Sequence, residues 1–149
     1  MKRISLSALA LAVALTLPLT APAQDQLQVG PVPAEGVVLA DFLWLQRPIV
    51  VFADRPDDPQ FIRQMALITA GLPELAERDV IVLTDTDPAA RTDARQRLRP
   101  RGFSLVLLDK DGQVKRRQPA PWSMREITHT IDRFPLRREE MLERAPSGR

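Results

Sequence analysis

The chain has 149 residues and none of them is cysteine, which excludes thiolate chemistry and stabilisation by disulfide bonds. Its 21 basic and 19 acidic side chains give a formal net charge of +2, well short of the strong positive charge typical of a general nucleic-acid binder. The single histidine, His129, excludes a histidine-based metal cluster, and we predict neither a metal nor a cofactor.

The first 23 residues have the layout of a secretory signal peptide. Lys2 and Arg3 form a positive start, residues 4–19 are almost uniformly apolar, and residues 21–23 (Ala-Pro-Ala) form a small-x-small cleavage site. The alternative is a membrane anchor, but a spanning helix needs about 20 apolar residues and this run is shorter. We therefore expect cleavage, a periplasmic or secreted protein, and no stable membrane span afterwards. A lipoprotein is excluded, because its lipid is attached to a cysteine.

Cleavage leaves residues 24–149, the size of one domain. We expect an extended lead-in over residues 24–40, a folded domain over residues 41–143 and a frayed tail over residues 144–149. A short edge strand is predicted within the lead-in, at residues 26–29.

The first half of the folded domain reads as strand, helix and strand. Residues 49–53 are continuously apolar and mostly β-branched, which predicts a strand buried on both faces. A helix follows, with Asp58 as its N-cap, Pro59 at its first position and Gly71 at its end. Residues 80–83 form a second apolar, β-branched run.

A second helix is predicted from Asp87 onward, because an N-cap residue followed by proline repeats the earlier pattern. Its inner face would carry small and apolar side chains. Its outer face would carry three arginines at helical spacing, namely Arg91, Arg95 and Arg99.

A hairpin and a closing helix complete the pattern. Residues 103–108 predict a third buried strand, and residues 114–117 a more exposed edge strand after a turn. Ser123 and Glu126 have the spacing of a capping box, and Pro135 is placed to end that helix. Residues 136–143 would add one or two helical turns. The order β-α-β-α-β-β-α predicts an α/β fold, a three-layer sandwich of the thioredoxin-like type.

Two segments resemble thioredoxin, and both lack its redox chemistry. Residues 101–114 resemble the thioredoxin stretch that carries a cis-proline facing the redox pair, and Ser104 stands in place of that proline. In the segment that should carry Cys-x-x-Cys, the cysteine positions fall near Pro56 and Pro59. Thiol–disulfide exchange is therefore excluded.

A closer resemblance spans residues 41–141. The chain is similar to the cysteine-free thioredoxin-like domains of unknown function (the DUDES type) found in exported bacterial proteins, in animal sushi-repeat-containing proteins and in equarin. The matching residues are 47–53, Asp58 and Pro59, Gln64, 77–79, 110–112, Lys115, Ile131 and Asp132, and 135–141. Phe134 and Leu136 replace the methionines that usually flank the proline. The resemblance implies an extracytoplasmic location and a thioredoxin-like fold, but no agreed activity.

Charge is segregated along the chain. Residues 54–87 contain eight acids and three bases, whereas residues 91–117 contain nine bases and three acids. Such asymmetry marks either an interaction surface or two solvated faces that partly neutralise each other. Our leading hypothesis is a non-catalytic module that binds an unknown protein, glycan or anionic ligand, and not nucleic acid. Its predicted binding residues are Arg91, Arg95, Arg99, Lys110 and Lys115.

Other interpretations remain open. A thiol-independent, hydrolase-like enzyme would use an Asp/Arg cluster formed by Asp54, Asp58 and Arg137, although Asp58 also suits a simple capping role. A structural envelope protein is a third interpretation. A further set of charged residues is expected to form either an ion network or separate surface salt bridges. This set comprises Lys110, Lys115, Arg137, Arg138, Asp79 and Asp132.

Overall fold

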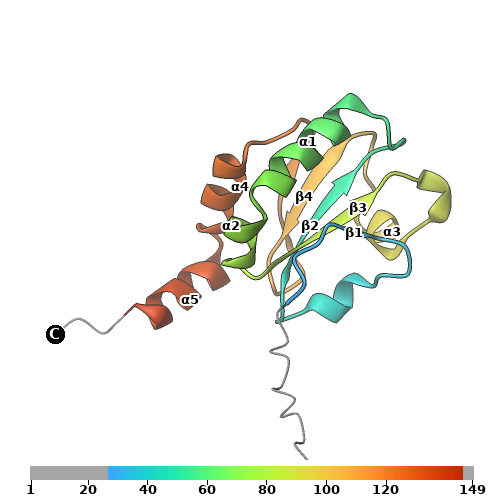
Figure 1. Cartoon of the computed structure of the whole chain (residues 1–149). Helices are drawn as coiled ribbons and strands as arrows, with labels where there is room; N and C mark the ends of the chain where they lie inside the picture. Colours follow the sequence, from blue (N-terminus) through green and yellow to red (C-terminus); the bar gives the residue numbers. More distant parts are fainter. Residues whose placement is uncertain (1–26, 146–149) are drawn as a thin grey trace, which may run out of the picture.

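The computed structural model describes residues 27–145, so the predicted signal peptide and most of the predicted tail lie outside the described residues. A five-stranded sheet with the order β1-β3-β2-β4-β5 forms the centre of the molecule (Figure 1). Its strands are β1 (Val32–Pro33), β2 (Arg47–Phe52), β3 (Val80–Asp85), β4 (Ser104–Leu108) and β5 (Val114–Gln118). No helix within residues 27–145 is long and apolar enough to cross a membrane.

The three central strands follow the predicted apolar runs. β2 pairs parallel with β3 and antiparallel with β4, and every residue of β2 and β4 is buried. β5 pairs antiparallel with β4 and is mostly exposed, as its three basic residues predict. The mixed α/β architecture predicted from the sequence is confirmed.

The predicted strand at residues 26–29 is wrong over its described part, residues 27–29, because β1 begins at Val32 and pairs parallel with β3. Val29 instead makes a single backbone contact, in which its carbonyl accepts a hydrogen bond from the Val82 amide at 2.7 Å. Gly30 then has φ +97, and a Cβ on it would lie 2.5 Å from the Val82 carbonyl oxygen. Glycine is required where the chain passes this close to β3.

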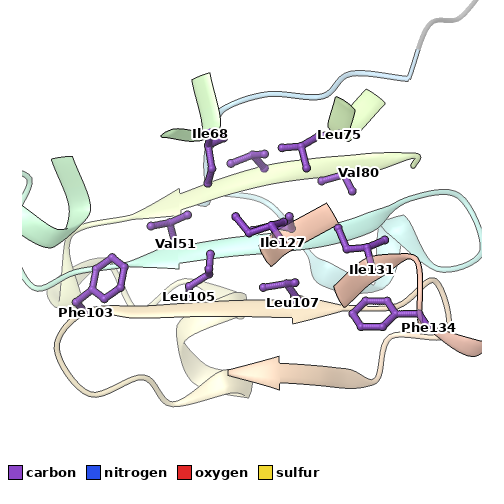
Figure 2. Close-up of a cluster of buried hydrophobic side chains, with 12 residues drawn as sticks. Val51, Ile68, Leu75, Val80, Phe103, Leu105, Leu107, Ile127, Ile131 and Phe134 are labelled. Carbon is purple, nitrogen blue, oxygen red and sulfur yellow. The ribbon is translucent and has the colours of Figure 1, made fainter. Parts of the chain in front are cut away.

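One face of the sheet carries the larger core (Figure 2). It is covered by α1 (Pro59–Ala70), α2 (Leu72–Ala76) and α4 (Met124–Ile131). The predicted caps are confirmed: Asp58 accepts from the Gln60 amide at 2.8 Å, and Ser123 and Glu126 form the capping box. The buried Gln64 side chain forms two hydrogen bonds with the Trp122 backbone, at 3.0 and 2.7 Å, and so ties α1 to the start of α4.

The opposite face is covered by η1 (Leu39–Phe42) and by α3 (Asp93–Leu98). The predicted continuous helix from Asp87 is wrong. A short 3-10 turn, η2 (Pro88–Ala90), ends at Arg91, whose φ of 47 is left-handed, and α3 begins afresh after Thr92. Thr92 accepts from the Arg95 amide at 3.0 Å and donates to the buried Asp85, and this tertiary contact fixes the new helix start.

The last helix, α5 (Pro135–Arg144), is longer than the one or two turns predicted. α4 ends at Ile131, before the predicted stop at Pro135, and Pro135 instead occupies the first position of α5, where proline is well tolerated. Arg137 is the buried residue of this helix, so α5 is anchored through a charged side chain.

Candidate functional site

The carboxyl ends of β2 and β3 hold the segment where thioredoxins carry their redox pair. Asp58 is occupied as the cap of α1, with its carboxylate 2.8 Å from the Gln60 amide. Asp54 is 61% exposed and lies 3.8 Å from an Arg95 nitrogen. Asp58 is therefore engaged in a structural cap, and Asp54 lies open to solvent.

Arg95 lies at the same end of the sheet but points inward. Its guanidinium bonds Asp85 at 2.8 and 3.1 Å and the Ala53 carbonyl at 2.9 Å. It also lies over the Phe52 ring, 5.4 Å from the centroid. The Asp85 side chain is 1% exposed and Arg95 is 12% exposed, so this pair joins α3 to the ends of β2 and β3. Arg95 therefore has a structural contact set and no free donor fork for a ligand.

The opposite end of the sheet contains a second, larger charged cluster. Arg47, at the start of β2, is fully buried together with Asp109, and their side chains are 2.9 Å apart. Arg47 also bonds the Arg78 carbonyl at 3.0 Å and Glu140 of α5 at 2.8 Å. Lys110 lies 2.8 Å from both Asp79 and Glu140. Burial raises the pKa of Glu140, but the hydrogen bonds from Arg47 and Lys110 outweigh it and lower that pKa to about 2.

The same cluster extends along α4 and α5 through Asp132. Arg78 binds Asp132 with two nitrogens at 2.8 and 2.9 Å, and Arg137 approaches it at 3.3 Å. Burial opposes ionisation of Asp132, yet these two guanidiniums hold its pKa below the usual range. We call the whole cluster the α5 network; it consists of Arg47, Arg78, Asp79, Asp109, Lys110, Asp132, Arg137 and Glu140.

The predicted ion network is thus present in part. Lys110 pairs with Asp79 and Arg137 with Asp132, as expected. Lys115 pairs instead with Asp111 at 3.4 Å. Arg138 has no ion pair within residues 27–145.

The predicted Asp/Arg cluster for a hydrolase does not assemble. Arg137 belongs to the α5 network at the start of β2, whereas Asp54 and Asp58 follow the end of that strand. Six residues of β-strand span about 20 Å, so the three side chains do not converge on one substrate. Asp58 in addition is bound to the backbone of α1.

The predicted arginine stripe is not a single surface. Arg91 and Arg99 occupy left-handed positions after η2 and α3, with φ of 47 and 48, and Arg95 is turned into the fold. Lys110 and Lys115 are both ion-paired. The prediction of a shared helical face is therefore wrong, while a binding role for Arg91, Arg99 or the lysines stays a prediction.

A different group of basic residues does converge. A groove of about 370 Å³ lies beside α3, at the start of β4 and the end of β5. We call it the arginine groove and define it by Arg99, Arg101, Phe103, Ser104 and Arg117, all of which line it. None of its three arginines has an acidic partner within residues 27–145.

The sheet register places Arg117 and Ser104 on the α3 face, whereas the Phe103 side chain belongs to the core on the other face. Arg117 lies opposite Val106, and Ser104 lies opposite Phe52. Val106 and Phe52 both belong to the core on the α3 face. Because paired residues of antiparallel strands project to the same side, Arg117 and Ser104 also face α3. Arg99 and Arg101 reach this face from the loop that follows α3.

Sequence reasoning missed Arg101 and Arg117 because it looked for helical spacing. The excess of basic residues between positions 91 and 117 was the signal that included them. The sequence alone could not group Arg117 with Arg99 and Arg101, because their proximity depends on β5 returning beside β4.

A larger cavity of about 510 Å³ lies between η1 and the end of β4. Its walls are mainly apolar, and its charged lining residues are already engaged: Arg97 with Asp93, Lys110 with Glu140 and Asp111 with Lys115. Within the described part of the chain, no three His, Asp or Glu side chains are grouped so as to hold a metal ion. The arginine groove, in contrast, is lined by three arginines that have no acidic partner within residues 27–145.

The fold and the missing redox residues define a thioredoxin-like protein without thiol chemistry. A reduced 2-Cys peroxiredoxin of Plasmodium vivax aligns with a TM-score of 0.55 and 14% identity, covering 69% of this chain and 84% of that one. The mitochondrial 2-Cys peroxiredoxin of Plasmodium falciparum aligns with a TM-score of 0.51 and 14% identity, covering 72% and 86%. Identities this low establish the fold alone.

Residues 38–140 match the family described as a domain of unknown function, DUF4174, and the chain belongs to that family. The coiled-coil domain-containing protein 80 of Danio rerio is similar, with 28% identity over 133 residues. The match covers 69% of this chain and 15% of that relative, so the chain spans a small part of its length.

Proposed function

We propose that this protein is an exported, non-catalytic binding module that holds an anionic ligand in the arginine groove. The observation that carries the proposal is that Arg99, Arg101 and Arg117 line one groove and have no acidic partner among the described residues. Guanidinium groups bind carboxylate, sulfate and phosphate through paired, planar hydrogen bonds. Elsewhere the chain neutralises its less exposed arginines, as at Arg47, Arg78 and Arg95.

Export is proposed on the layout of residues 1–23, and a periplasmic or secreted location follows from it. The resemblance to domains of exported bacterial proteins and of animal sushi-repeat-containing proteins and equarin supports the same location. An enzyme built on Asp54, Asp58 and Arg137 finds no support, because these residues lie at opposite ends of β2. A structural role in the envelope has no particular residue in its favour.

A thermal-melt panel tests the proposal. The purified protein is melted with sulfate, phosphate and heparin-like oligosaccharides, and a ligand at 100 times its dissociation constant adds about 2.7 kcal/mol. The matched variants are R99A/R101A/R117A and R63A/R125A/R133A, each removing three exposed arginines. We expect a shift with an anion that the first variant loses and the second keeps. An equal shift in both variants would place the binding elsewhere.

A further inference from the structure

β5 is the outermost strand of the sheet, and its outer edge is bare. It pairs with β4 on one side only, and it is drawn beyond the strand that carries Leu105 and Leu107 in Figure 2. Three of its five residues are exposed. Within residues 27–145, no hydrogen bond engages the backbone on that outer side. A free edge of this length is a template for one more strand.

The side chains of β5 make that edge selective. Lys115, Arg116 and Arg117 are consecutive, so two copies of β5 placed side by side would repel each other. An acidic strand would be attracted instead. Positive charge on an edge strand thus opposes self-pairing and favours one class of partner.

The two faces of β5 differ, and the difference predicts a pattern in the partner. Arg117 faces the arginine groove, next to Arg99 and Arg101. Arg116 projects to the other face, where its guanidinium lies 5.5 Å from the centre of the Trp122 ring. Because strand side chains alternate between faces, every second residue of an added strand would meet the groove.

We propose that the occupant of this edge is an extended acidic peptide that adds to β5 as a sixth strand. Its carboxylates lie at alternate positions and enter the arginine groove, while the residues between them face Arg116 and Trp122. This inference rests on the proposed function, since it names the ligand class for the same groove. It adds the requirement that the peptide backbone, and not charge alone, makes the contact.

The test uses synthetic peptides of about eight residues, the length of a typical strand, in which Glu alternates with Val or Thr. Binding to the purified protein is followed by fluorescence anisotropy. Two further peptides carry N-methyl groups, one on the odd and one on the even backbone amides. In an added strand only one of these two sets faces β5. We expect that one N-methylated peptide loses affinity by about tenfold or more, whereas the other stays close to the parent.

Variants separate this inference from the proposed function. R117A and R99A should each lower the affinity for the parent peptide by about two- to fivefold, as exposed charge pairs do, and R63A on α1 should not.

Equal losses of affinity for both N-methylated peptides would show a purely electrostatic contact and overturn the added strand, while leaving the anion site intact. If a sulfated oligosaccharide binds and no peptide does, the added strand is likewise overturned and the anion site remains. Failure of every anion would overturn both proposals. If the protein without peptide forms a dimer through β5, the edge belongs to a second copy of the chain, and the inference is overturned.

Discussion

The charged residues at the two ends of the sheet differ in burial and in ion pairing. In the α5 network, Arg47 and Asp109 are fully buried and each guanidinium has an acidic partner or a backbone carbonyl. In the arginine groove, Arg99, Arg101 and Arg117 are exposed and have no acidic partner within the described chain. Pairing in three dimensions is what separates a structural cluster from a candidate binding surface.

The largest effect is expected at Arg47. Replacing it with methionine leaves Asp109 buried without its cation and removes the main partner of Glu140. Removing one member of a buried ion pair costs about 3–5 kcal/mol. Chemical denaturation should therefore show a much lower free energy of unfolding for R47M. As the matched control, R63A changes an exposed arginine of α1 and should stay within about 0.5 kcal/mol of the parent. A loss below about 1 kcal/mol for R47M would show that the α5 network is not what holds this end together.

The next effect is an acid sensitivity located in α5. The pKa of Glu140 falls from 4.5 to about 2 in the folded protein. Because the folded pKa is lower than the unfolded one, the stabilisation is present above pH 4.5 and is lost as the pH falls toward 2. A shift of this size corresponds to about 3 kcal/mol. Asp132, whose pKa is also lowered, adds to the loss at the acid end.

Urea titrations of the parent and of E140Q between pH 6 and pH 2 measure this effect, in a window set by the pKa values above. The parent should lose stability steadily as the pH falls, and E140Q should start less stable at pH 6 and lose less on acidification. Parallel curves for the two proteins would mean that Glu140 is not the group responsible.

A good part of the fold could be predicted because its signals are local. The apolar runs at residues 49–53, 80–83 and 103–108 lie on the three central strands, and the Ser123–Glu126 capping box starts α4. The helix from Asp87 was misjudged because its real boundary depends on Thr92 bonding Asp85 across the fold. The spacing of residues along a predicted helix does not reveal such a tertiary contact.

The candidate sites were harder to predict, for the same reason. Arg47 meets Asp109 and Glu140 from sequence separations of 62 and 93 residues, and nothing around Arg47 marks it as buried. The stripe of Arg91, Arg95 and Arg99 was derived from the misjudged helix, so it failed with that helix. Arg101 and Arg117 come together with Arg99 only because the β4–β5 hairpin places them there. Residues that share a site through strand pairing leave no periodic trace in the sequence.

A smaller loss of stability is expected at Arg95. This arginine lies in the basic segment of residues 91–117, yet it is largely buried and ion-paired, as the arginines of the α5 network are. R95M removes the guanidinium that bonds Asp85 and the Ala53 carbonyl, and leaves a carboxylate that is 1% exposed. Thr92 still donates to Asp85 in this variant, but the charge-assisted bonds from Arg95 are lost, and hydrogen bonds to charged groups contribute about 1.5–3 kcal/mol. Thermal or urea unfolding of R95M should show a loss in this range, and R91M, at an exposed position four residues earlier, should show almost none. Equal stabilities for the two variants would contradict the structural role of Arg95.

The smallest effect on stability is expected in the arginine groove. A small effect would show that its arginines are not needed for folding. R99A, R101A and R117A remove exposed guanidiniums without acidic partners, so each free energy of unfolding should stay within about 0.5 kcal/mol of the parent. Three neighbouring positive charges repel one another, and removing one of them can even raise stability slightly at low salt. Unchanged stability in all three variants would support the proposal that these arginines serve a ligand and not the fold. If instead the three variants unfold as readily as R95M, the groove is part of the scaffold, and the contrast between the two ends of the sheet disappears.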